Sequence, residues 1–118
     1  MARWVLLISS FFLFLSSFNA NSHFFDKNQL IQRCQILNEE LKELESHQYK
    51  ALCQRKLGSA ANKIESARVK IIYDNYKDAQ HYLSTSIEDL KFAEDVSCAF
   101  KTGITKAKME AKAIKKEL

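Results

Sequence analysis

Asp78, His81 and the hydroxyl side chains that follow them come nearest to a catalytic set in this sequence. An Asp and a His three residues apart share one face of a helix, and Ser84, Thr85 and Ser86 come soon afterwards. Nucleophilic catalysis requires a hydroxyl within hydrogen-bond reach of the base and an oxyanion site beside both. Residues on one helix do not form such a pocket. We therefore interpret this group as a solvated polar face and predict that the protein is not an enzyme.

The histidines and the clustered glutamates do not indicate a metal site or an acid–base pair. The three histidines are His23, His47 and His81. They are far apart, and none has the spacing to Cys, Glu or another His that a zinc site uses. Glu39, Glu40 and Glu43 lie beside Lys42, which is typical of an outward charged helix face. We expect neither a metal nor another cofactor.

Six lysines near the C-terminus are the best candidate binding residues. They are Lys101, Lys106, Lys108, Lys112, Lys115 and Lys116. They surround an apolar stripe, and a basic amphipathic helix can lie on anionic lipid, with about 1 kcal/mol contributed by each lysine. The alternative is an ordinary solvated face, because lysines suit the end of a helix and the stripe holds small alanines with no Trp or Phe to insert. The sequence leaves both interpretations open.

Length and composition restrict the fold class. The chain has 118 residues, enough for one small domain, with two glycines and no prolines. An all-β fold needs many turns rich in these residues, and a nucleotide-binding α/β fold needs a glycine-rich phosphate loop. An all-α fold remains.

The first 22 residues have the pattern of a secretory signal peptide. Arg3 gives a positive start, residues 4–18 are apolar apart from serines, and Ala20 and Ser22 are small residues at the positions that signal peptidase reads. Cleavage is predicted before His23. An uncleaved anchor is the alternative, but it needs about 20 apolar residues and this stretch has 15. Cleavage leaves 96 residues of net charge +3, in the periplasm or outside the cell.

Asp26 is predicted to start the first helix. Its carboxylate can cap free amides, and Gln29 follows three residues later as in a capping box. Phe25 and Leu30 occupy the positions of a hydrophobic staple. Apolar residues then repeat every three or four positions along one face: Leu30, Cys34, Leu37, Leu41 and Leu44. The phase is lost at residues 46–48, which predicts a turn near His47.

The second predicted helix spans residues 48–73. Its apolar stripe consists of Tyr49, Cys53, Leu57, Ala60, Ile64, Ala67 and Ile71. The stripe continues past Gly58, which weakens a helix by about 1 kcal/mol relative to Ala. In the alternative interpretation the chain breaks at Gly58, after a helix over 27–57. Asp74-Asn75 is the best turn signal.

Two further stripes complete the predicted fold. The third contains Tyr76, Ala79, Leu83, Ser86, Leu90, Ala93, Ser97 and Phe100, and the fourth contains Ile104, Ala107, Ala111, Ile114 and Leu118. Thr102-Gly103 between them predicts a stop or hinge. Four apolar faces joined by short connections predict a single up-down helical bundle over 23–118.

The register of the predicted helices restricts the disulfide pairing. Counted from the turn at Asp74, Cys53 and Cys98 lie at similar heights on antiparallel helices, whereas Cys34 and Cys53 are offset by roughly 9 Å along the axis. We therefore favour a Cys53–Cys98 disulfide with Cys34 free and buried. The alternative is three reduced core cysteines.

Two resemblances bear on function. Tyr76, Ala79, Leu83, Cys98 and Phe100 resemble a stretch of the plant pectin methylesterase and invertase inhibitors, which are secreted, disulfide-linked helical bundles. This resemblance implies an inhibitor, and an inhibitor-like hairpin would be favoured by a Cys34–Cys53 pair and disfavoured by Cys53–Cys98. In composition, the chain is similar to small exported proteins of Gram-negative bacteria, some of them effectors.

Three functional hypotheses follow. The first is a secreted, non-catalytic bundle that acts through protein–protein interaction. The second is an effector that docks on anionic or phosphoinositide membranes through its lysine-rich C-terminal helix. The third is the inhibitor. Nucleic acid is not an expected partner because export separates the protein from it, and the oligomeric state is open.

Overall fold

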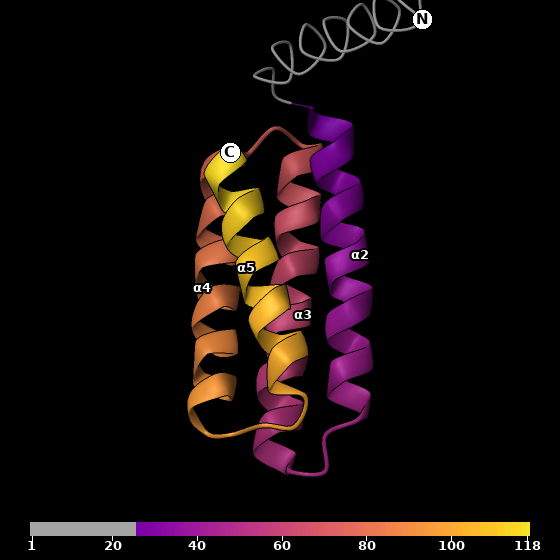
Figure 1. Cartoon of the computed structure of the whole chain (residues 1–118). Coiled ribbons are helices and arrows are strands. Elements are labelled where there is room, and N and C mark those ends of the chain that lie inside the picture. Colours follow the sequence, from indigo (N-terminus) through magenta and orange to yellow (C-terminus); the bar gives the residue numbers. More distant parts are fainter. Residues whose placement is uncertain (1–25) are drawn as a thin grey trace, which may run out of the picture.

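In the part of the chain that the structure describes, four helices form an antiparallel bundle (Figure 1). The computed structural model describes residues 26–118. Its helices are α2 (Lys27–Ser46), α3 (Ala51–Ile72), α4 (Tyr76–Asp95) and α5 (Lys101–Glu117). Each helix packs on two neighbours, in the cyclic order α2, α3, α4, α5, and α2 and α5 share the smallest of the four interfaces. The predicted all-α bundle is confirmed. The predicted signal peptide and the staple residue Phe25 lie outside the described residues.

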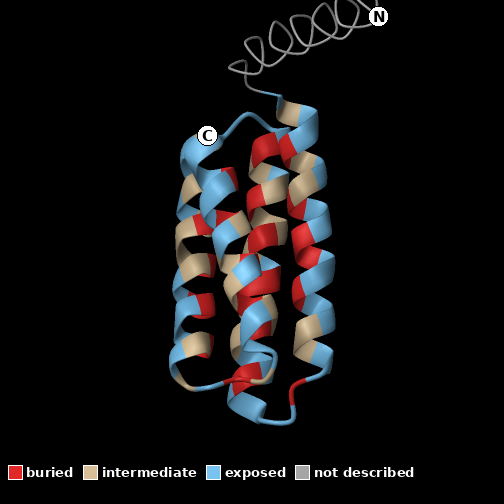
Figure 2. Cartoon of the chain, in the orientation of Figure 1, coloured by how far each residue is buried: buried red, intermediate tan, exposed pale blue. Residues whose placement is uncertain are grey.

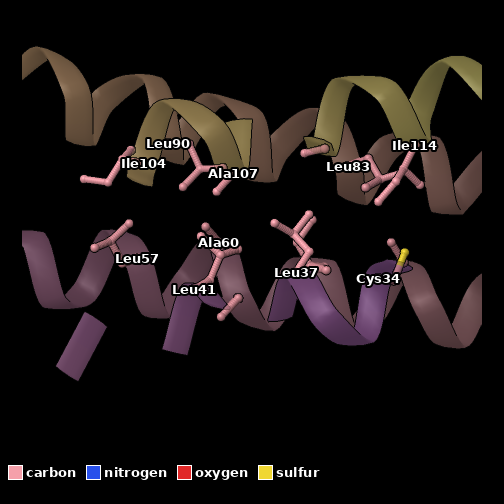
Figure 3. Close-up of a cluster of buried hydrophobic side chains, with 14 of the residues drawn as sticks. Cys34, Leu37, Leu41, Leu57, Ala60, Leu83, Leu90, Ile104, Ala107 and Ile114 are labelled. Carbon is pink, nitrogen blue, oxygen red and sulfur yellow. The ribbon is translucent and has the colours of Figure 1, made fainter. Parts of the chain in front are cut away.

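The predicted apolar stripes form the core. Figure 2 shows the buried residues on the inward faces of the helices, and in Figure 3 side chains of α2 and α3 face those of α4 and α5. The largest buried apolar side chains are Leu37, Leu41, Leu57, Ile64, Ile71, Leu83, Leu90, Ile104 and Ile114. Burial of a Leu or Ile side chain contributes about 1.5–3 kcal/mol, so these stripes are the main source of stability.

The first half of the chain follows the predicted helices closely. Asp26 caps α2, as expected, by accepting a hydrogen bond from the Gln29 amide at 3.2 Å. Gly58 lies inside α3, so the alternative with a break there is wrong. The predicted start of the second helix, at residue 48, is also wrong. α3 begins at Ala51, and Tyr49, which was expected in its apolar stripe, precedes the helix and is 80% exposed.

The break between the last two helices falls earlier than predicted. α4 ends at Asp95 and α5 begins at Lys101, so Thr102-Gly103 is in the first turn of α5 and is not a hinge. The stop is made by Ser97, whose φ of 61° is left-handed. The Cys98 amide then bonds the Ala93 carbonyl, and the Ser97 amide bonds the Glu94 carbonyl. This Schellman motif usually has glycine at the left-handed position. Because serine stands there instead, no signal in the sequence marks the end of α4.

Both glycines instead permit close approach to α2. A Cβ atom on Gly103 would lie 3.0 Å from Leu44 Cδ2, and one on Gly58 would lie 3.0 Å from Glu45 Oε1. The first turn of α5 can therefore pack directly against Leu44. The two glycines mark helix packing in this protein and not chain reversal.

Candidate binding cleft at the loop end of the bundle

The α2–α3 and α4–α5 connections lie at the same end of the bundle, at the bottom of Figure 1. We call this the loop end. A disulfide between Cys53 and Cys98, with Cα atoms 5.6 Å apart, fixes the start of α3 to the segment that follows α4. The predicted pairing is confirmed, and Cys34 is free and buried.

A buried glutamine reinforces the same junction. Gln48 Nε2 donates to the carbonyl of Ala99 at 2.7 Å, and the amide of Ala99 donates to Gln48 Oε1 at 2.8 Å. Gln54 Nε2 in turn donates to the Gln48 carbonyl at 2.7 Å. The Gln48 side chain therefore satisfies both backbone groups of a residue in the other connection. Sequence analysis missed this residue, because a lone glutamine in a turn has no local signal.

Phe100 comes directly after Ala99 in the sequence and has an unusual backbone conformation. Its φ of 63° and ψ of 48° are left-handed, a region that costs a bulky residue about 1–3 kcal/mol. The side chain is also 58% exposed, although the predicted stripe placed it in the core. The His47 and Phe100 rings are nearly perpendicular, with 5.7 Å between their centroids. The fold thus holds an apolar ring in solvent at an energetic cost.

A cleft of about 500 Å³ opens beside this ring, between the end of α2 and the start of α5. It is lined by Glu40, Glu43, Leu44, His47, Phe100, Gly103 and Lys106. Because Gly103 has no side chain, the half-buried Leu44 remains accessible from the cleft. The volume lies within the range of known ligand sites, which combine an apolar surface with a few polar groups.

The polar rim of the cleft carries two carboxylates, Glu40 and Glu43, and one ammonium group, Lys106. Glu40 and Glu43 are exposed, and neither carboxylate forms an ion pair with another residue of the 26–118 region. His47 Nδ1 donates to the Glu43 carbonyl at 2.8 Å, which fixes the imidazole against the end of α2. The sequence identified these glutamates as an outward face but did not place them beside an apolar cleft.

The C-terminal lysines are divided between solvent and the bundle. Lys101, Lys106, Lys112, Lys115 and Lys116 are exposed. Lys108 instead donates to Glu94 at 2.6 Å, and Thr105 bonds the same carboxylate. These contacts lower the pKa of Glu94. Lys108 is thus held in an ion pair between α5 and α4, and its role in binding an anionic surface stays a prediction.

The apolar stripe of α5 is covered by its neighbours. Ile104, Ala107, Ala111 and Ile114 are all buried. The face that would enter a lipid layer therefore packs against the rest of the bundle. None of the described helices has the length and apolar character to cross a membrane.

The hydroxyl groups near His81 are used in hydrogen bonds to backbone carbonyls, two within α4 and one from α4 to α3. Ser84 donates to the carbonyl of Gln80, Thr85 to that of Tyr82, and Ser86 to that of Ala60. Across residues 26–118, no group of three or more His, Cys, Asp or Glu side chains could hold a metal ion. Burial raises the pKa of the Cys34 thiol to about 12, so this cysteine stays protonated and weakly nucleophilic at neutral pH.

Comparison with known proteins gives no family. No protein-family model matches the chain, and no curated protein or solved structure is significantly similar to it. The site must therefore be interpreted from its own geometry.

Proposed function

We propose that this protein is an exported, non-catalytic binding protein whose loop-end cleft receives an apolar side chain from a partner polypeptide. The observation that supports this most strongly is Phe100, an exposed ring held in a left-handed conformation beside the cleft. Strained residues persist where the surrounding structure holds them, and they cluster at functional sites. Here the Cys53–Cys98 disulfide and the Gln48–Ala99 hydrogen bonds hold the residues just before Phe100.

The charges at the rim indicate the kind of partner. A side chain that enters between Leu44 and Phe100 brings its neighbours close to Glu40 and Glu43. Unpaired carboxylates favour Lys or Arg at those neighbouring positions, through charge-assisted hydrogen bonds. The proposed partner segment therefore contains a large apolar residue with a basic residue next to it.

Export is supported by the signal-peptide pattern and is compatible with the disulfide, since disulfides persist in oxidising compartments. The inhibitor hypothesis is not supported by the cysteines. A Cys34–Cys53 disulfide would favour an inhibitor-like hairpin, whereas the disulfide in this protein joins Cys53 and Cys98. Insertion of α5 into a membrane is not supported either, because its apolar face is buried.

Selection of a random peptide library on the folded, disulfide-bonded protein tests the proposal. We expect the selected peptides to share an apolar residue beside Lys or Arg and to bind Phe100→Ala poorly. Tyr49→Ala is the matched control, because Tyr49 is a more exposed aromatic residue near the same end that does not line the cleft. Peptides that share no such pattern, or that bind both variants equally, would contradict the proposal.

A further inference from the structure

A second hollow lies between α4 and α5, near the C-terminal end of α5. Its volume is about 700 Å³, and it is lined by Gln80, Ser84, Ile87, Glu88, Lys112, Lys115 and Lys116. This region is at the opposite end of the bundle from the loop-end cleft (Figure 1). We call it the lysine groove.

The three lysines of this groove form a concentrated positive charge. Lys112 is three residues from Lys115 and four from Lys116, so all three ammonium groups emerge from neighbouring positions on the helix. All are exposed, and none forms an ion pair with a carboxylate of the described residues. Like charges at this spacing repel one another. A bound anion would remove that repulsion.

The opposite wall supplies neutral and acidic groups. The Gln80 side chain is half-buried and makes no hydrogen bond within residues 26–118, so its amide can donate to a ligand. Ser84 already donates to the Gln80 carbonyl at 2.9 Å. Glu88 lies in the same groove and repels anions. The groove therefore suits a compact anion at the lysines better than an extended negatively charged surface.

We propose that the lysine groove binds a phosphate group, with the lysine ammonium groups and the Gln80 amide donating to its oxygens. Phosphate accepts several charge-assisted hydrogen bonds at once, and lysine is a common phosphate ligand. The phosphate can belong to a soluble ester or to a lipid headgroup, and the two sources differ in whether a vesicle is required. This site is separate from the loop-end cleft and does not depend on the function proposed for it.

NMR titration of the folded protein with pyrophosphate, and with vesicles containing a phosphatidylinositol monophosphate, tests this proposal. We expect the Gln80 side-chain amide and the Lys112 backbone amide to shift. The double variant Lys112→Gln/Lys116→Gln should bind at least about tenfold more weakly, as expected for lost charge-assisted contacts. Lys91→Gln/Lys101→Gln makes the same charge change at two exposed lysines that line neither the groove nor the loop-end cleft, and should have little effect. Glu88→Gln should strengthen binding.

The two probes distinguish the sources. Binding to pyrophosphate indicates a soluble phosphate ester. Binding only to the vesicles indicates a lipid headgroup, provided that it is stronger than binding to phosphatidylserine vesicles of equal charge. The proposal is overturned if neither probe binds. Equal weakening by the two double variants also overturns it, because general charge attraction would then explain the binding.

Discussion

Gln48 and Ala99 are paired by two hydrogen bonds that connect the two loops at one end of the bundle, although 51 residues separate them in sequence. Cys98 is disulfide-bonded to Cys53, and the Phe100 carbonyl accepts the first hydrogen bond of α5 from Ile104. Three successive residues are thus fixed by three different contacts. This arrangement holds the exposed Phe100 ring beside the loop-end cleft.

Replacement of Gln48 by Ala should lower the free energy of unfolding by about 1–3 kcal/mol. The substitution removes both hydrogen bonds to the half-buried backbone of Ala99, and each such bond contributes about 0.5–1.5 kcal/mol. Denaturant unfolding measures the change. Gln35→Ala is a suitable control, because Gln35 is an exposed glutamine on α2. Equal losses in the two variants would mean that the Gln48 hydrogen bonds do not stabilise the junction.

Loss of the disulfide should cost roughly 2–4 kcal/mol of stability. The bond closes a loop of 45 residues, and such cross-links mainly restrict the unfolded chain. The variant Cys53→Ser/Cys98→Ser should therefore unfold at a lower denaturant concentration than the oxidised protein. Reduction of the wild type should give the same shift. An unchanged midpoint after either treatment would contradict a stabilising disulfide.

Gly58→Ala should raise the free energy of unfolding by about 1 kcal/mol. Alanine is the better helix former, and the new Cβ meets only the flexible carboxylate end of Glu45. Gly103→Ala should raise the free energy of unfolding by a smaller amount, because the new Cβ would press on Leu44, which packs against the core. Thermal unfolding of both variants gives the comparison. The packing explanation fails if Gly103→Ala is the more stabilising of the two.

Cys34 should make stability fall at alkaline pH. Burial raises the folded-state pKa of the thiol from 9.0 to about 12. The unfolded chain therefore releases this proton first, so the associated stability is complete below pH 9 and is lost as pH rises to about 12. The slope is at most about 1.4 kcal/mol per pH unit. Unfolding curves of wild type and Cys34→Ala should diverge over this window, and parallel curves would contradict a buried thiol.

The fold was largely predictable because its signals are local. Stripes with intervals of three and four residues identified the helices, and Asp26 and Asp74-Asn75 marked a cap and a turn. The break after α4 was missed because Ser97 and Phe100 adopt left-handed conformations that usually belong to glycine. Gly103 serves helix packing in the first turn of α5, so its position was misleading as a stop signal, whereas the helix was correctly predicted to continue past Gly58.

The candidate site was only partly predictable. The lysines were recognisable as a group, since they lie close together on one helix. Nothing local indicated that Lys108 pairs with Glu94. The loop-end cleft joins the end of α2 to Phe100 and the start of α5, about 50 residues later. Such a site depends on tertiary packing, and a pattern within one helix does not reveal it.

The most direct test of the account is the affinity of one library-selected peptide for wild type, Phe100→Ala and Tyr49→Ala. Removal of a central aromatic anchor costs about 2 kcal/mol or more, so Phe100→Ala should bind roughly 30-fold more weakly. Tyr49→Ala should bind like the wild type. Isothermal titration calorimetry, with circular dichroism to verify folding, measures all three. Equal affinity of wild type and Phe100→Ala would contradict the central claim that the cleft beside Phe100 is the binding site.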